Sequence, residues 1–162
     1  MTRVQAAAAA AIVLAIAACD DDDPIDTGED FIAEMTVGAE VPPVQVVTSA
    51  TGTARFEFDD DADEVSYTID VADITGVLAA HIHGPATTSE SAGVLVTLFA
   101  GPQGGTGEVN GQLTSDTFTE ADNPGTVSMD SVLVLMRNGR SYVNVHTVAN
   151  PPGEIRGQIQ PD

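Results

Sequence analysis

The chain contains no lysine, no tryptophan and only one cysteine. Its five basic residues are all arginines, and 25 acidic residues give it a formal net charge of −20. Binding to a nucleic acid or to an anionic membrane surface depends on clustered basic side chains, so we expect no nucleic-acid partner and no electrostatic attraction to lipid. The single cysteine excludes an internal disulfide framework.

The length and hydrophobic content together predict one folded domain. A chain of 162 residues fits one ordinary domain, whereas two domains would each have a small core. Hydrophobic residues make up 43% of the chain, which is enough to build a core and excludes disorder throughout.

The N-terminal segment has the pattern of a secretory signal peptide. Arg3 precedes an apolar run from Ala6 to Ala18, which is shorter than a membrane-spanning helix requires. Ile16-Ala17-Ala18-Cys19 resembles the bacterial lipobox, in which small residues precede a cysteine that is acylated and becomes N-terminal. We therefore predict a lipoprotein signal peptide over residues 1–18 and a lipid anchor on Cys19. The alternative is an ordinary secreted protein in which this cysteine is incidental.

The residues after Cys19 are acidic and contain Pro24 and Gly28. Such a segment cannot bury apolar surface, so we predict an extended, solvated tether over residues 19–30 and a folded domain over residues 31–162. Lipidation would make the membrane a partner through the anchor. It would place the domain in the cell envelope, on the periplasmic side or at the surface.

Alternating polar and apolar residues predict short β-strands. Residues 51–58 and 65–71 both alternate, and a polar connection of hairpin length joins them. Further strands are expected at 31–37, 77–83, 93–99, 107–113, 141–147 and 154–160, with glycine- and proline-containing turns between them. This pattern predicts an all-β fold, an antiparallel, Greek-key-like β-sandwich of about eight short strands.

One short helix is expected in this fold. Ser128 is suited to cap its start, Asp130 lies in its first turn, and Gly139 follows its expected end.

Two sequence blocks carry a family resemblance. The first is His81-Ile82-His83-Gly84-Pro85, and the second is Val143-Asn144-Val145-His146-Thr147, which is followed by Gly153-Glu154-Ile155-Arg156-Gly157. Together they resemble the CHRD domain, the module repeated in chordin and found singly in many bacterial exported proteins. The resemblance spans about residues 31–160. It implies a β-sandwich and, for animal members, extracellular binding of growth factors.

All three histidines of the chain fall within these blocks. Strand periodicity places His81 and His83 on one face, and Asn144 and His146 on one face of the later strand. The hairpin partner adds Glu154 and Arg156 to the polar side. If the strands are neighbours, three imidazoles converge there and can hold Zn²⁺ or Cu²⁺. Alternatively, the histidines are half-buried hydrogen-bonding residues that tie two strands together.

This arrangement also resembles the copper site of copper–zinc superoxide dismutase, where a His-x-His strand meets a late histidine on the outside of a β-sandwich. The resemblance implies copper ligands at His81, His83 and His146, with Arg156 guiding an anion and Asn144 and Glu154 beside it. It does not extend to dismutase activity, because the chain has no fourth histidine that could bridge to zinc.

The favoured function is a membrane-anchored, extracytoplasmic and non-enzymatic binding or structural module, whose partner is an unknown protein or glycan. The alternative is a copper- or zinc-binding protein that uses the three histidines, with redox chemistry as an option. Loss of the histidines separates the two, since only a metal-binding protein would lose its ligand.

Overall fold

The computed structural model describes residues 28–122 and 127–162. The predicted signal peptide, Cys19 and most of the predicted tether lie outside the described residues. Regular structure begins at Glu29, slightly before the expected end of the tether. Within the described residues, no helix has the length and apolarity that a membrane span requires.

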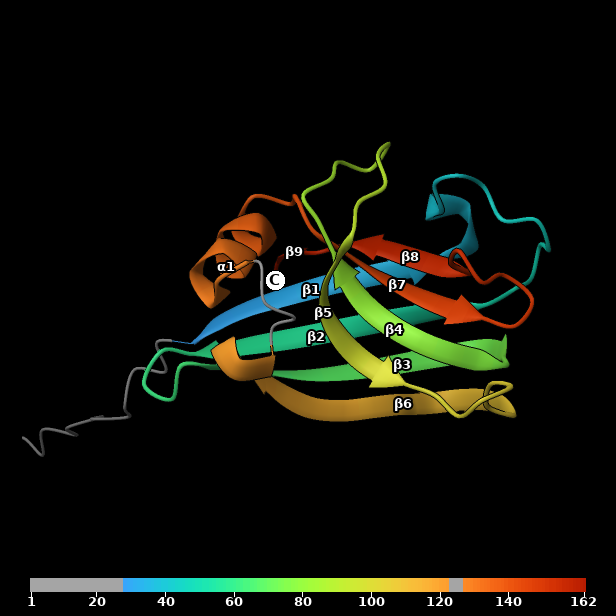
Figure 1. Ribbon diagram of the computed structural model, residues 1–162, viewed down its shortest axis with the longest axis horizontal. Helices are drawn as coiled ribbons and strands as arrows, with labels where there is room; N and C mark the ends of the chain where they lie inside the picture. Colours follow the sequence, from blue (N-terminus) through green and yellow to red (C-terminus); the bar gives the residue numbers. More distant parts are fainter. Residues whose placement is uncertain (1–27, 123–126) are drawn as a thin grey trace, which may run out of the picture.

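Nine antiparallel strands form one sheet (Figure 1). The strands are β1 (Glu29–Thr36), β2 (Thr51–Asp59), β3 (Glu64–Thr75), β4 (Val77–His83), β5 (Val94–Ala100), β6 (Glu108–Thr119), β7 (Tyr142–Thr147), β8 (Ile155–Gln158) and β9 (Gln160–Pro161). Their order is β5-β4-β7-β8-β1-β2-β3-β6, and β9 pairs with β1. Two 3₁₀ turns (Val37–Ala39 and Glu120–Asp122) and the helix α1 (Met129–Arg137) complete the described structure.

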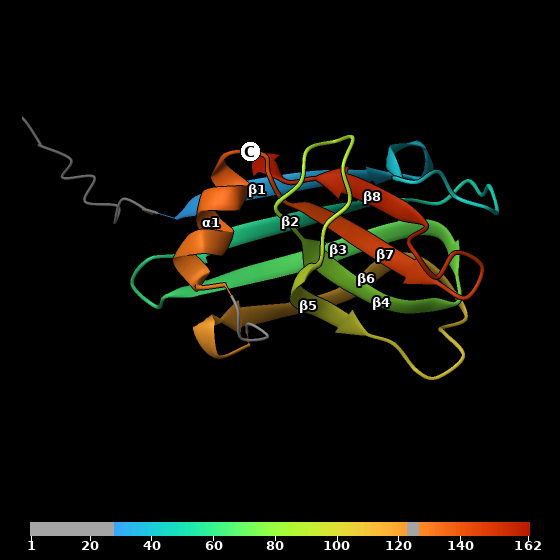
Figure 2. The same ribbon diagram turned by 45° about the horizontal axis from the view of Figure 1, so that its top comes forward.

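The sheet curls into a nearly closed barrel, so that β5 and β6, the two ends of the strand order, come into contact (Figures 1 and 2). The predicted all-β class, the antiparallel pairing and the short helix are confirmed. The two layers of the expected sandwich are the two sides of this one curled sheet.

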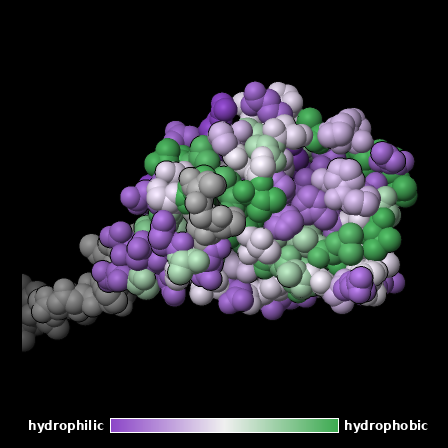
Figure 3. Space-filling model, viewed as in Figure 1, coloured by the Kyte–Doolittle hydropathy of each residue, from purple (hydrophilic) through white to green (hydrophobic). Residues whose placement is uncertain are grey.

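Side chains that alternate along the strands fill the interior of the barrel. The alternation that places Asn144 and His146 on one face of β7 directs Val143 and Val145 to the other face, and both are fully buried together with Ile155. Four further residues are buried in the same core: Phe56, Leu95, Leu98 and Ile159. On the outer face drawn in Figure 3, hydrophobic and hydrophilic residues are interspersed.

The helix α1 begins where the sequence predicts. The backbone N–H of Ser131 donates to Oγ of Ser128 at 3.3 Å, which satisfies one of the free donors at the helix start. The apolar side of the helix is buried and contacts β9 near the C-terminus (Figure 1). Gly139, just past the end, has φ = 59°, a conformation that glycine adopts without a steric penalty.

Two connections cover the outer face of β4, β7 and β8. The first is residues 37–50, between β1 and β2. The second is residues 84–93, between β4 and β5, and it projects beyond these strands in Figure 1. Nη2 of Arg156 donates to the carbonyl oxygen of Thr87 at 2.9 Å, and Oγ1 of Thr48 donates to Glu154 at 2.8 Å. We expected this polar face on the outside of the sheet. It does lie there, but Asn144, Glu154 and Arg156 are buried beneath the connections, while His81 and His146 are half-buried.

Candidate metal centre

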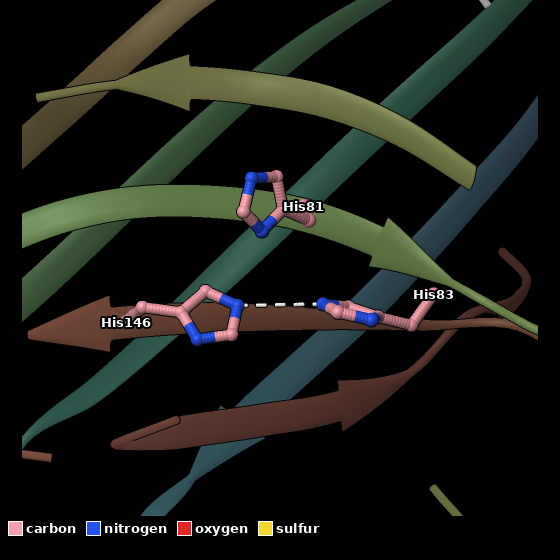
Figure 4. A group of neighbouring side chains, drawn as sticks. All are labelled: His81, His83 and His146. Carbon is pink, nitrogen blue, oxygen red and sulfur yellow. Dashed lines mark hydrogen bonds between the residues drawn. The ribbon is translucent and has the colours of Figure 1, made fainter. Parts of the chain in front are cut away.

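The structure brings the three histidines of the chain together. His81 and His83 lie on β4 and His146 lies on β7, which is the neighbouring strand. One ring nitrogen from each residue lies within 4.8 Å of one from each of the others. Figure 4 shows a ring nitrogen of His81 directed toward the gap between the other two rings.

The register of β4 and β7 explains this convergence. His83 pairs with Tyr142, four residues from His146, and His81 lies opposite Asn144, between these two positions. The rings of His83 and His146 reach toward each other along the strands, so that their Nε2 atoms are 3.3 Å apart (Figure 4). Because the three side chains lie on the same face of two paired strands, no loop has to move to assemble them.

Two backbone carbonyls set the tautomers of the paired rings. Nδ1 of His83 lies 3.1 Å from the carbonyl oxygen of Ala92, and Nδ1 of His146 lies 3.0 Å from that of Pro151. A carbonyl oxygen only accepts hydrogen bonds, so each Nδ1 carries the proton. In the neutral rings both Nε2 atoms then carry a lone pair, and these lone pairs face each other.

This geometry suits a metal ion better than a hydrogen bond between the rings. An ion with nitrogen ligands at about 2.0–2.1 Å in tetrahedral geometry holds neighbouring ligand atoms about 3.3 Å apart. The separation of the two Nε2 atoms is 3.3 Å. Nδ1 of His81 is buried and has no hydrogen-bond partner among the described residues, so it keeps its capacity to bind a ligand or an ion.

Burial keeps the three rings neutral. Desolvation lowers the pKa of His81 and of His83 from 6.5 to about 4, and the neighbouring imidazoles add to this effect. The pKa of His146 is lowered as well, mainly by desolvation. Neutral imidazole is the form that can bind a metal ion, and all three rings are in this form at neutral pH.

A stack of side chains supports His83. Its ring stacks on Tyr142 with centroids 5.1 Å apart and ring planes 8° apart. Cζ of Arg156 lies 3.5 Å from the centre of the same tyrosine ring, in the geometry of a cation–π contact. The arginine is 1% exposed, so its positive charge is held inside the molecule, and this charge contributes to the lowered pKa of His83.

The other predicted site residues lie near the histidines but contact different partners. Glu154 accepts hydrogen bonds from Thr48 and Thr147, at 2.8 and 2.5 Å, and so ties residues 37–50 to the end of β7. Asn144, which pairs with Arg156 across β7 and β8, donates to Glu40 at 3.3 Å. Of these predicted residues, Arg156 alone contacts the stack on His83.

A buried acidic residue, Glu40, joins this polar cluster. Burial raises its pKa to about 7, although Arg156 and the hydrogen bond from Asn144 partly offset the increase. One oxygen of Glu40, Oδ1 of Asn144 and Nη1 of Arg156 have no hydrogen-bond partner among the described residues. The cluster is therefore polar and only partly satisfied.

Sequence reasoning did not identify Glu40, Tyr142, Ala92 or Pro151 as parts of the site. For Glu40 and Tyr142 a signal existed in the side chain itself, an acidic and an aromatic residue within the span that resembles the CHRD domain. For Ala92 and Pro151 there was none, since a backbone carbonyl is present whatever the side chain is.

The fold and the site together define an antiparallel barrel whose outer face holds three histidines between covering loops. The sequence profile of the CHRD domain matches residues 31–159, and the chain belongs to this family. The match covers both histidine-containing blocks. A comparison with curated proteins finds no match to the chain.

Proposed function

We propose that this CHRD-domain protein binds one divalent transition-metal ion, copper or zinc, through His81, His83 and His146. The observation that carries the proposal is the pair of Nε2 atoms 3.3 Å apart on rings whose Nδ1 atoms face backbone carbonyls. Metal-binding histidines characteristically donate their second ring N–H to a carbonyl or carboxylate, which orients the ring. Two of the three rings have such a partner here.

The donor set indicates the class of ion. Imidazole suits copper and zinc, and three neutral nitrogen ligands leave a further position for water or an added ligand. Nitrogen sites generally prefer Cu²⁺ to Zn²⁺, so we expect the higher affinity for copper. The three imidazoles support binding of the ion, and the proposal is limited to metal binding.

Calorimetric titration tests the proposal. The chain from residue 19 onward, with Cys19→Ser and without an affinity tag, is titrated with Cu²⁺ and with Zn²⁺ at neutral pH. We expect one ion per chain, and loss of this binding when all three histidines are replaced by alanine. Since the chain has no other histidine, imidazole coordination in the Cu²⁺ electron paramagnetic resonance spectrum reports this site alone.

Acidic residues provide the control, because 25 of them could bind ions nonspecifically. Asp60→Asn, Asp61→Asn and Asp63→Asn in the exposed β2–β3 hairpin should leave the stoichiometric binding unchanged. If the wild-type chain and the triple histidine variant gave the same isotherm, the ion would be bound by acidic groups and the proposal would be wrong.

We also propose that the protein is lipid-anchored in the cell envelope through Cys19. The support is in the sequence, where Cys19 directly follows an apolar run that ends in two alanines. Acyl chains contribute about 0.8 kcal/mol per buried CH₂ to membrane binding. Labelling with a radioactive fatty acid in the native host should mark the wild-type protein and not Cys19→Ser, and an unlabelled wild-type protein would refute the anchor.

A further inference from the structure

The hydroxyl group of Tyr142 contacts the backbone of Ala92, whose carbonyl group sets the tautomer of His83. The backbone N–H of Ala92 donates to this hydroxyl at 3.1 Å, and the hydroxyl lies 3.5 Å from the carbonyl oxygen of Ala92. The same carbonyl oxygen lies 3.1 Å from Nδ1 of His83. Tyr142 therefore holds the residue that His83 uses as its hydrogen-bond acceptor.

The ring of Tyr142 fixes His83 in a second way. The two rings are stacked 8° from parallel with centroids 5.1 Å apart, which limits rotation of the imidazole about its side-chain bonds. Tyr142 is itself 2% exposed, and the guanidinium of Arg156 lies 3.5 Å from its ring centre. In the strand order, β7 lies between β4 and β8, so His83 and Arg156 approach Tyr142 from opposite sides.

We propose that Tyr142 is a positioning residue of the metal site: it holds His83 as the Nδ1–H tautomer, with Nε2 aimed at His146. This inference rests on the proposed metal binding and adds to it the residue that orients one ligand. Tyr142 does not touch the ion. It acts through the ring stack and through Ala92.

The chemical reason is that a histidine binds a metal through only one nitrogen at a time. If the Ala92 carbonyl moved away, the proton of the neutral ring could shift to Nε2, and the ligating lone pair would then point away from His146. Loss of an outer partner of a metal-binding histidine typically weakens metal affinity by about 10–100-fold. We therefore expect the single hydroxyl group of Tyr142 to matter for binding.

Tyr142→Phe tests the proposal, because it retains the ring stack and removes only the hydroxyl. The chain has one other tyrosine, Tyr67, which is also buried and donates to the carbonyl oxygen of Leu98 at 2.6 Å, within the hydrophobic core of the barrel. Tyr67→Phe is therefore a matched control that also loses one buried tyrosine hydrogen bond.

Two readouts are measured on the chain from residue 19 onward with Cys19→Ser. The first is the dissociation constant for Zn²⁺, which should increase about tenfold or more in Tyr142→Phe and remain near wild type in Tyr67→Phe. The second is the nitrogen-15 spectrum of the metal-free histidine rings. It should show His83 as the Nδ1–H tautomer in the wild-type chain and a rising share of the Nε2–H tautomer in Tyr142→Phe.

The tautomer measurement separates this inference from the proposed function. If the wild-type chain bound no metal, the proposed function would fail, yet the metal-free spectra would still test whether Tyr142 sets the tautomer. The inference is overturned if wild-type His83 is the Nε2–H tautomer, a result that needs no variant to fold. It is also overturned if both tyrosine variants match wild type in tautomer and affinity.

Discussion

Nε2 of His83 and Nε2 of His146 lie 3.3 Å apart although 63 residues separate the two histidines in the chain. Each ring is held from behind, His83 by the carbonyl of Ala92 and His146 by that of Pro151. Ala92 lies in the covering connection 84–93 and Pro151 in the turn between β7 and β8, so the strands alone do not orient the rings. This connection and this turn complete the site.

Metal binding should persist well below the usual pH range of histidine. From sequence alone, affinity is expected to fall near the ordinary histidine pKa of about 6.5. Because desolvation lowers the pKa of His81 and His83 to about 4, protons compete with the ion only at more acidic pH. Zn²⁺ titrations over a pH series should therefore show the loss of affinity at a pH below 6.5, since the pKa of His146 is lowered as well. A midpoint near 6.5 would contradict the burial of these rings.

Replacing Glu40 should change how stability depends on pH. The pKa of Glu40 is raised from 4.5 in the unfolded chain to about 7 in the folded protein, mainly by desolvation. The stability that protonated Glu40 contributes to the fold is therefore fully present below pH 4.5. It is lost as the pH rises through 7, because the buried carboxylate becomes charged. Glu40→Gln removes this loss and should raise the free energy of unfolding above about pH 8, relative to wild type, by roughly 1–3 kcal/mol.

Urea unfolding of wild type and Glu40→Gln, at acidic and at mildly alkaline pH, measures this difference. The control is Glu57→Gln, which changes an exposed glutamate on β2. If the difference in the free energy of unfolding between Glu40→Gln and wild type were the same at both pH values, ionisation of Glu40 would not destabilise the fold.

Ile155 should be essential to the core layer of β8. It is fully buried together with Val143 and Val145, so Ile155→Ala leaves a cavity and should cost about 2–5 kcal/mol. Val47, which is 81% exposed, provides the control, and Val47→Ala should change stability by less than about 0.5 kcal/mol. Chemical denaturation measures both. An unchanged midpoint for Ile155→Ala would mean that this face of β8 does not pack in the interior.

Gly157 should resist substitution because the backbone of the neighbouring strand β1 lies against it. A Cβ atom at this position would clash with the carbonyl oxygen of Glu34, and a backbone atom cannot move aside cheaply. Gly157→Ala should therefore separate β8 from β1 and destabilise the fold by about 1–3 kcal/mol. Gly107→Ala is the control, since no heavy atom lies within 4 Å of its added Cβ. Equal melting temperatures of the two variants would exclude a tight contact between β1 and β8.

The strands were predictable where one face is buried and less so elsewhere. The alternation in residues 51–58 predicted β2 closely, and that in 65–71 predicted the first part of β3, because Phe56 and Ile69 face the core while their neighbours are more exposed. β3 continues to Thr75. β6 was predicted over 107–113 but extends from Glu108 to Thr119. Most of its residues are exposed, and it is pairing with β3, up to Thr119 opposite Glu64, that extends the strand. Backbone pairing of an exposed strand does not require alternating polar and apolar residues, so the sequence carries no sign of it.

The amino-acid sequence by itself determined the strand faces, the family and the set of histidines, because period-2 alternation and the two histidine blocks are local properties of the chain. Only the tertiary structure decided that Asn144, Glu154 and Arg156 of the polar face are buried, that Glu40 joins them, and that backbone carbonyls of the connections orient the rings. The physical reason is that these features depend on loops folding back over a sheet. Backbone carbonyls, which every residue carries, then serve as partners, and no residue pattern marks which of them will be used.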